Sequence, residues 1–321
     1  MIVGHDRAID SWLAAWASRR MHHAWLVAGP RGVGKASFAR AAALRVLAEA
    51  AGPRPIMPGI EVEADHPTAR LVAAGSHPDY RQLERLERDR GGLARNISVD
   101  QVRGLGEMLS VTPSMSPWRA ILIDSIDDLE ASAANALLKM LEEPPANTLF
   151  LLVSHAPGRL LPTIRSRCRR LDLDPLADNA MTSLLNRWFP DEKPDRVSAL
   201  VTLSGGSPGR ALEAANLDLG PLEAAARAIM SDGDPTNSRR SKLASELGAK
   251  AAADRYAAFL AMVPALLARE ARQTGGRRRQ RALDAYAKAR ETAAIAPRLS
   301  LDPAFTVFQL GGLLASLSPN G

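Results

Sequence analysis

The sequence predicts an α/β domain built on a parallel β-sheet, followed by a chain that is helical throughout. Three short apolar runs, at residues 24–29, 120–124 and 148–154, are continuous rather than alternating, as strands buried on both faces of a parallel sheet are. Stretches with helical spacing separate these runs, which is the order that right-handed crossovers between parallel strands require. After about residue 173 the strand signals stop. We therefore expect the sheet to lie within residues 1–173.

The first apolar run leads directly into a glycine-rich loop with the spacing of a phosphate-binding loop. Residues 29–37 read GPRGVGKAS, and Gly29, Gly34 and Lys35 match the pattern G-x-x-x-x-G-K. Together with Gly32, these residues would let backbone N–H groups turn toward phosphate oxygens, while the helix N-terminus and the lysine add positive charge. A helical stretch follows, so strand, loop and helix stand in the order the motif requires. The alternative is a glycine-rich turn that binds nothing.

Two positions of this predicted nucleotide site lack groups that ATP hydrolysis needs. Where the motif ends in a hydroxyl residue that holds magnesium, the chain has Ala36, and Ser37 is turned about 100° away along a helix. Asp124, at the end of the second apolar run, has the place of a Walker B aspartate. Ser125 follows instead of the glutamate that activates water, and serine is no general base near neutral pH. We expect no ATP hydrolysis by the chain itself; the alternative is a rearranged site that uses Ser37 and Asp127.

The composition is that of a folded protein in a reducing compartment. With 46% hydrophobic and 24% charged residues, the chain has the composition of a globular protein rather than a disordered one. Because His5, Asp6 and Arg7 interrupt its start, we expect no secretory signal. The longest apolar run, at residues 257–268, is shorter than the ~20 residues of a membrane span, so we expect no span. The single cysteine, Cys168, excludes an internal disulfide and a multi-cysteine zinc site, and we expect a cytoplasmic protein.

The chain divides into three predicted domains. The first, residues 1–173, contains a segment at 50–98 that is rich in proline, glycine and charge, which we expect to be an insertion outside the core. Residues 174–218 contain three short helical stretches between proline and glycine breaks, which predict a small helical domain. Residues 219–321 are rich in alanine and leucine at helical spacing and predict a third, all-helical domain.

Longer motifs in the first half are similar to those of a known family. The strings HHAWLVAGPRGVGK, ALLKMLEEPP and IRSRC, with the spacing between them, resemble the clamp-loader branch of the AAA+ ATPases over residues 4–173. The resemblance implies an AAA+ phosphate-loop (P-loop) domain, a helical lid over residues 174–218 and an all-α collar over residues 219–321. It also implies an open five-membered ring in which ATP lies between neighbouring subunits. Other loader subunits, and through them the sliding clamp and primed DNA, are then the expected partners.

The same resemblance implies roles for three further residues. Arg167, in IRSRC, would reach the γ-phosphate of ATP bound by a neighbouring subunit, an action in trans worth ~10³-fold in rate. Ser154 corresponds to sensor 1 near the γ-phosphate, and Arg210 to sensor 2 on the lid. Alternatively, Arg167 is an ordinary surface arginine and Ser154 is a polar residue at a strand end. Arg210 would then cap the contact of the lid with the first domain. Many relatives carry a four-cysteine zinc module, but here His66 and His77 have no thiol partners. We therefore expect no zinc, and ATP or ADP bound at most without hydrolysis.

Two features near the C-terminus allow two interpretations each. The net charge is +6, and the densest basic run, GGRRRQR at residues 275–281, would either contact DNA phosphate or begin a solvated helix. The apolar segment at residues 305–317 would serve either the domain core or an interface between collars. An independent nucleic-acid-binding protein is a third functional hypothesis, but aromatic residues, which stack on single strands, make up only 4% of the chain.

Overall fold

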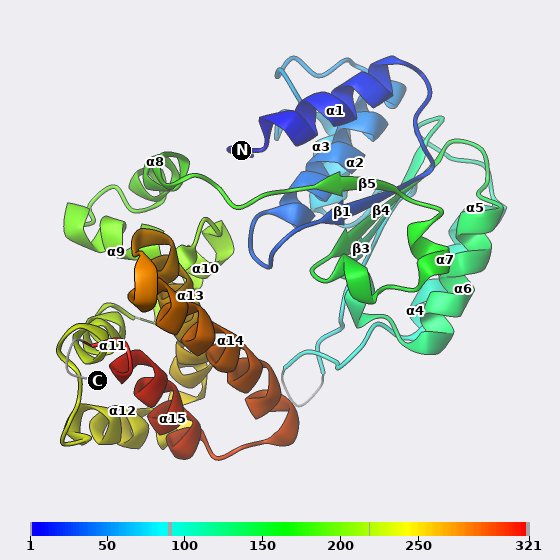
Figure 1. The fold of residues 1–321 in the computed structure, drawn as a ribbon. Coiled ribbons are helices and arrows are strands. Elements are labelled where there is room, and N and C mark those ends of the chain that lie inside the picture. Colours follow the sequence, from blue (N-terminus) through cyan, green and yellow to red (C-terminus); the bar gives the residue numbers. More distant parts are fainter. Residues whose placement is uncertain (1, 89–91, 218, 319–321) are drawn as a thin grey trace. The chain divides into compact units, whose positions relative to one another are not determined.

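The chain folds into two compact units, Met1–Ala180 and Met181–Gly321 (Figure 1). The structure is a computed structural model, and it describes residues 2–88, 92–217 and 219–318. The first unit is the α/β domain that the sequence predicts, and the second is helical. The separation of the second unit into a lid and a collar remains a prediction.

The first unit is built on a five-stranded parallel sheet with the strand order β2-β3-β4-β1-β5. Its strands are β1 (Ala24–Ala28), β2 (Tyr80–Leu83), β3 (Arg119–Asp124), β4 (Thr148–Ser154) and β5 (Arg169–Asp172). The three predicted apolar runs are β1, β3 and β4, and both β1 and β4 are buried along their whole length. Because all strands run in one direction, their carboxyl ends meet at one edge of the sheet, where loops bring polar side chains together.

Helices cover both faces of the sheet. One face carries α1 (Asp6–Ala17), α2 (Lys35–Ala51) and α3 (Pro67–Ala73), and the other carries α4 (Val99–Arg103), α5 (Leu105–Ser110), α6 (Ala131–Glu142) and α7 (Pro162–Arg165) (Figure 1). Short 3-10 turns, η1 (Ile126–Asp128) and η2 (Pro157–Arg159), follow β3 and β4. On the first face Trp12 packs edge-on against Trp25 and Phe38, with ring centroids 4.9 and 6.4 Å away. Alternate strand residues therefore serve two separate cores, Trp25 one and Leu26 the other.

The prediction that residues 50–98 lie outside the core is wrong in part. Strand β2 falls within this range, and Tyr80 is buried in the core on the α1 side of the sheet. β2 lies at the edge of the sheet and pairs only with β3, so Arg81 and Gln82 reach solvent and no continuous apolar run marks the strand. Residues 89–91 lie outside the described residues.

The described part of the second unit is made of helices. They are α8 (Asp178–Trp188), which begins in the first unit, α9 (Pro194–Ser204), α10 (Pro208–Asn216), α11 (Gly220–Asp232), α12 (Ser238–Gly248), α13 (Ala253–Gln273), α14 (Gly276–Leu299) and α15 (Pro303–Ala315). The first three are the short helices predicted within residues 174–218. The apolar segment at 305–317 lies mostly in α15, where Val307, Leu310 and Leu314 are buried, so the structure supports its interpretation as core.

Helix α13 bears on the expectation that no segment of the chain spans a membrane. Together with the preceding 3-10 turn η3 (Lys250–Ala252) it is long and apolar enough to cross a membrane by length and composition, and its most apolar 18-residue window has a mean hydropathy of 1.3. The length of the run at 257–268 therefore does not by itself exclude a span. The helix packs against α14 and α15, and its buried residues are Phe259, Leu260, Met262, Val263, Leu266, Leu267 and Ala271. Core helices of soluble proteins can have the same length and composition, so these two properties are weak evidence for a span.

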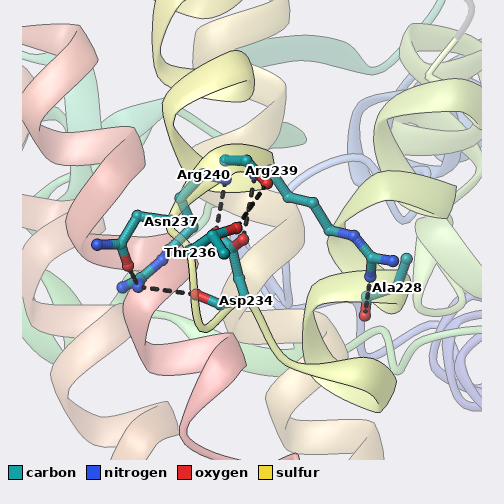
Figure 2. A network of polar contacts seen from close by, with 7 residues as sticks. Ala228, Asp234, Thr236, Asn237, Arg239 and Arg240 are labelled. Carbon is teal, nitrogen blue, oxygen red and sulfur yellow. Dashed lines mark hydrogen bonds and ion pairs between the residues drawn. The ribbon is translucent and has the colours of Figure 1, made fainter.

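Asp234 lies between α11 and α12 and is the buried centre of a polar network that joins these two helices (Figure 2). Asp234, 6% exposed, accepts hydrogen bonds from the backbone N–H groups of Arg239 (3.1 Å) and Arg240 (2.9 Å), and pairs with Arg240 Nε at 3.1 Å. Arg239 Nη1 donates to the carbonyl oxygen of Ala228 at 2.9 Å, and the Arg240 guanidinium lies 4.9 Å from the centroid of the Phe308 ring. Burial raises the pKa of Asp234, but these hydrogen bonds and the arginine charge outweigh it and hold the pKa below its ordinary value. The network therefore joins α11 to α12, and the contact between Arg240 and Phe308 adds α15.

Candidate functional site

The predicted phosphate-binding loop lies between β1 and α2, at the carboxyl edge of the sheet, and α2 begins at Lys35. Three of its glycines adopt positive φ angles, 152° at Gly29, 80° at Gly32 and 102° at Gly34, which residues with side chains rarely adopt. At Gly29 a Cβ atom would also lie 2.2 Å from the carbonyl oxygen of Leu173, so only glycine fits there. The glycines of the motif therefore fix the backbone path of the loop.

Lys35, 3% exposed, directs its ammonium back at the loop. Its Nζ donates hydrogen bonds to the carbonyl oxygens of Gly29 at 2.8 Å and Pro30 at 2.6 Å. Burial lowers the pKa of Lys35 to about 8, although the negative charges of Asp124 and Asp127 act to raise it. A phosphate group would offer this ammonium a full negative charge in place of two carbonyl dipoles, so the loop fits an anion.

The magnesium ligands of an ATPase site are incomplete. Ala36 has no side-chain oxygen, and Ser37 is exposed on α2. Asp124 ends β3, where burial raises its pKa although the charges of His155 and Lys35 oppose the change. In the part of the chain that the structure describes, no three His, Cys, Asp or Glu side chains gather as a metal site requires. The residues present fit a phosphate group but lack the hydroxyl ligand for the magnesium ion that hydrolysis uses.

Ser125, at the position of the catalytic glutamate, faces the interior and is 2% exposed. Its Oγ donates to Asp128 Oδ2 at 3.1 Å. The same carboxylate oxygen lies 3.4 Å from Arg85 Nε, and the Asp128 carbonyl accepts the Ile97 N–H at 2.8 Å. These contacts tie η1 to the segment before α4. Ser125 therefore contributes to the fold and places no base at the site.

Asp127 links the carboxyl ends of β3 and β4. One of its oxygens accepts hydrogen bonds from Ser154 Oγ at 3.0 Å and the Ala156 N–H at 3.2 Å, and the other accepts the His155 N–H at 2.6 Å. Ser154, the predicted sensor 1, is fully buried and lies beside Ala28, the last residue of β1. The structure thus brings Ser154 to the edge of the site, where its hydroxyl bonds to Asp127.

His155 is a residue of this edge that the predicted site did not include, and Asp127 entered only the alternative. Desolvation lowers the pKa of His155, as do Lys35 and Arg31, while Asp127 and Asp124 oppose the change. These residues lie at or just after the ends of β1, β3 and β4, and they meet because the strands are neighbours in the sheet. The signal that would have found them is the convergence of polar residues that directly follow adjacent parallel strands.

Arg167, the predicted trans-acting arginine, lies at the opposite end of the sheet from the phosphate loop. Strand β5 runs parallel to β1, with Arg169 beside Trp25, so residues before β5 lie near the start of β1, whereas the loop follows its end. The five residues of β1 separate the two ends by about 17 Å at 3.3 Å per residue. This distance exceeds the length of an arginine side chain, so Arg167 does not reach the loop of its own chain.

Two contacts hold the guanidinium of Arg167. Its Nη2 lies 2.7 Å from Glu142 Oε1, and its Nη1 donates to the carbonyl oxygen of Thr163 at 2.9 Å. The side chain of Arg167 is 33% exposed and that of Glu142 is 48% exposed. The adjacent Cys168 packs against the core on the α6 side of the sheet, and burial raises the pKa of its thiol to about 12. The backbone that carries Arg167 is therefore anchored while its guanidinium reaches solvent.

Arg210, the predicted sensor 2, belongs to the second unit. It lies in the first turn of α10, where its backbone N–H donates to Ser207 Oγ at 3.4 Å, and its side chain is exposed. Because the phosphate loop belongs to the first unit, the role of Arg210 at a nucleotide stays a prediction.

Comparison with known proteins identifies relatives of this chain. A family model described as "DNA polymerase III, delta subunit" matches residues 4–177. The delta-prime subunit of DNA polymerase III from Pseudomonas aeruginosa is 39% identical over 199 residues, which are 61% of this chain and 57% of that protein. The delta-prime subunit from Escherichia coli is 34% identical over 204 residues, 63% of this chain and 57% of that protein. The chain thus spans a little over half the length of these relatives.

A solved structure of a DNA polymerase III gamma-subunit-related protein from Thermotoga maritima is similar at 15% identity, over 96% of this chain and 99% of that one. Its TM-score of 0.46 is too low to add to the argument.

The matched residues 4–177 contain the phosphate loop, all five strands and Arg167, and they make up more than half of the chain. A phosphate loop after β1 of a five-stranded parallel sheet, followed by helices, confirms the fold class that the sequence predicts. The chain belongs to the family described as DNA polymerase III, delta subunit.

Proposed function

We propose that this chain acts as the delta-prime subunit of a DNA polymerase III clamp loader and hydrolyses no ATP itself. As a component of the DNA polymerase III holoenzyme it would complete the loader ring, which loads the sliding clamp onto primed DNA. The gamma/tau and delta subunits are its proposed partners, and clamp and DNA are reached through the complex. The similarity to delta-prime subunits supports this function. A role in replication also supports the expected cytoplasmic location.

The observation that carries the proposal is the position of Arg167 at the end of the sheet opposite the phosphate loop. There the guanidinium is out of reach of a nucleotide on its own chain and partly exposed. In a ring of subunits joined head to tail, such an arginine would meet the nucleotide of the next subunit. Its charge would stabilise the negative charge that builds up on the γ-phosphate in the transition state.

The chain's own loop would hold phosphate or a nucleotide without turnover. The positive-φ glycines, the N-terminus of α2 and the Lys35 ammonium support anion binding. Hydrolysis would additionally need a magnesium ligand and a base, and Ala36 and Ser125 stand where those groups are required. The proposed role requires no cofactor, and the absence of zinc belongs to the same proposal.

A catalytically active motor subunit is the second candidate, and it needs Ser37 and Asp127 to replace the missing groups. Asp127 already accepts three hydrogen bonds from the end of β4, which leaves its carboxylate poorly suited to activate water. Ser37 is exposed one position along α2 from the place of the magnesium hydroxyl. These contacts favour the non-hydrolysing subunit over the motor.

The test measures ATP turnover by the reconstituted loader with clamp and primed DNA present. Arg167→Ala should lower turnover at the neighbouring site by ~10³-fold, because the transition-state charge loses its partner. Lys35→Ala should change turnover little, because no hydrolysis depends on this loop. Arg165→Ala is the matched control, since Arg165 is an exposed arginine of α7 two residues away.

Turnover that falls with Lys35→Ala and survives Arg167→Ala would show that the loop is an active ATPase site, which contradicts the proposal. Hydrolysis by the purified chain alone, abolished by Lys35→Ala, would contradict it as well.

A further inference from the structure

Helix α6 ends beside two adjacent glutamates, Glu142 and Glu143, at the negative end of its dipole. Carboxylates there weaken a helix, and Lys139 is the basic residue of the last turn. Both glutamates are exposed, so burial does not explain them. A carboxylate kept at an unfavourable helix end indicates a compensating contact or a function.

The compensating contact of Glu142 is its ion pair with Arg167. Glu142 Oε1 lies 2.7 Å from Nη2, and the Thr163 carbonyl oxygen accepts a hydrogen bond from Nη1 at 2.9 Å. These two acceptors leave three of the five guanidinium N–H donors available to another anion. The contacts therefore fix the orientation of the guanidinium without using up its capacity to bind a phosphate.

We propose that Glu142 is a positioning residue for Arg167, which it holds ready for the nucleotide of the neighbouring subunit. This inference rests on the proposed function, because it requires Arg167 to act in trans. An unrestrained arginine samples many rotamers and must be ordered as the transition state forms. A carboxylate that orders the side chain beforehand removes this entropic cost from the chemical step.

An exposed ion pair without function is the competing explanation, because most such pairs contribute little. The two explanations differ once the charge of Glu142 is removed. A merely structural pair would leave turnover unchanged and shift the unfolding temperature slightly. A positioning pair would lower kcat with KM unchanged, because Glu142 acts on the transition state through Arg167 and touches no substrate.

The experiment measures turnover against ATP concentration for the loader assembled from the full chain and its partner subunits, with clamp and primed DNA. The variants are Glu142→Gln, Arg167→Ala and the double variant. Glutamine keeps the shape of the side chain and a weaker hydrogen bond but removes the charge. Glu143→Gln is the matched control, because Glu143 is the adjacent exposed carboxylate and forms no ion pair with any residue that the structure describes.

We expect Glu142→Gln to remove more than about half of the turnover that Arg167→Ala removes, through kcat. Glu143→Gln should remove none. In the Arg167→Ala background Glu142→Gln should cause no further loss, because the residue it positions is gone. Turnover of Glu142→Gln equal to or above that of the wild type would overturn the proposal, and so would an equal further loss in the Arg167→Ala background.

Failure of the proposed function would look different, since Arg167→Ala would then leave turnover unchanged. Co-elution with the partner subunits and thermal unfolding of each variant separate lost positioning from lost folding. If Glu142→Gln does not assemble, Glu142→Asp takes its place, because it keeps the charge on a side chain one methylene shorter. Its kcat should lie between those of the wild type and Arg167→Ala, and wild-type kcat would overturn the proposal.

Discussion

At the carboxyl end of the sheet Lys35 and Asp127 are bonded to the chain itself, whereas Arg167, before β5, has two contacts and is partly exposed. Lys35 donates to two loop carbonyls, and Asp127 accepts three hydrogen bonds from the end of β4. Arg167 has one carboxylate and one carbonyl as partners, and a third of its side chain is exposed. The first arrangement stabilises the fold, and the second suits an assembly.

This difference shows how a phosphate-loop domain can keep its shape without a bound nucleotide. In an active site Lys35 would bind the phosphates of the nucleotide, and the residue at position 125 would activate the attacking water. Here Lys35 bonds to the loop, and Ser125 bonds to Asp128. Because Lys35, Ser125, Asp127 and Ser154 all have hydrogen-bond partners within the chain, these polar groups are satisfied without a ligand.

The largest effect on stability is expected at Asp234, whose side chain is 1% exposed and pairs with Arg240. Asp234→Asn should lower the free energy of unfolding by about 3 kcal/mol at pH 7, because it leaves Arg240 without its charged partner. Because the pKa of Asp234 is lowered in the fold, its contribution is full above the unfolded value of about 3.9 and is lost as the pH falls through the folded pKa. Urea denaturation at pH 7 and at lower pH measures both effects.

The matched control is Asp232→Asn, because Asp232 also pairs with an arginine, Arg239, at 2.9 Å but is 58% exposed. It should change the free energy of unfolding far less than Asp234→Asn does, because solvent screens an exposed ion pair. Equal losses of unfolding free energy for Asp232→Asn and Asp234→Asn would mean that burial does not decide how much a charge stabilises the fold. The contrast between internally bonded and exposed charges would then be wrong.

The next largest effect is expected at Asp127. A variant at this position tests whether the residue stabilises the fold or takes part in ATP hydrolysis. Asp127→Asn should lower the free energy of unfolding by about 2 kcal/mol, because its amide group cannot accept all the hydrogen bonds from Ser154 and residues 155–156. Loader turnover should stay near that of the wild type. Asp100→Asn, which alters an exposed aspartate, is the control for stability. A fall in turnover as large as that of Arg167→Ala would favour the motor subunit.

A smaller effect of opposite sign is expected at Lys35. Lys35→Met should raise the free energy of unfolding by about 1–2 kcal/mol at pH 7, because the folded state pays for a buried ammonium. With a folded pKa of about 8 and an unfolded one near 10.4, this gain should be full below pH 8 and disappear as the pH rises toward the unfolded value. Lys139→Met, at an exposed lysine of α6, should show no such pH dependence. Destabilisation by Lys35→Met at pH 7 would mean that the loop needs the ammonium to fold.

The sequence predicted the features that depend on neighbouring residues along the chain. Strands β1 and β4 are continuous apolar runs because both faces of the sheet are covered, and the loop follows β1 because its glycines allow positive φ angles. Arg167 was found through a motif, IRSRC, that is local as well. Each of these signals lies within a few residues of the sequence and can be recognised without knowledge of the fold.

The features that the sequence did not predict depend on residues that meet across the fold. Strand β2 lacks an apolar run because it is an edge strand with one neighbour. Asp127 meets Ser154, 27 residues later, because β3 and β4 are adjacent. Glu142 meets Arg167 because α6 packs against α7. Pairing of strands and packing of helices decide these contacts, and no local pattern carries them.

The smallest effect is expected at the basic run 275–281, which tests whether Arg167 differs from other exposed arginines. Arg277 and Arg279 are exposed at the start of α14, while Arg278 Nε lies 2.7 Å from Glu270 in α13, as in a solvated helix start. Replacing Arg277, Arg278 and Arg279 by alanine should leave the salt dependence of DNA binding by the assembled loader unchanged. If all three arginines contacted phosphates, the slope of log K against log salt would fall by about 0.9 for each. Such a fall would show that arginines of the second unit contact DNA. Arg167 would then be one of several exposed arginines that act on a partner.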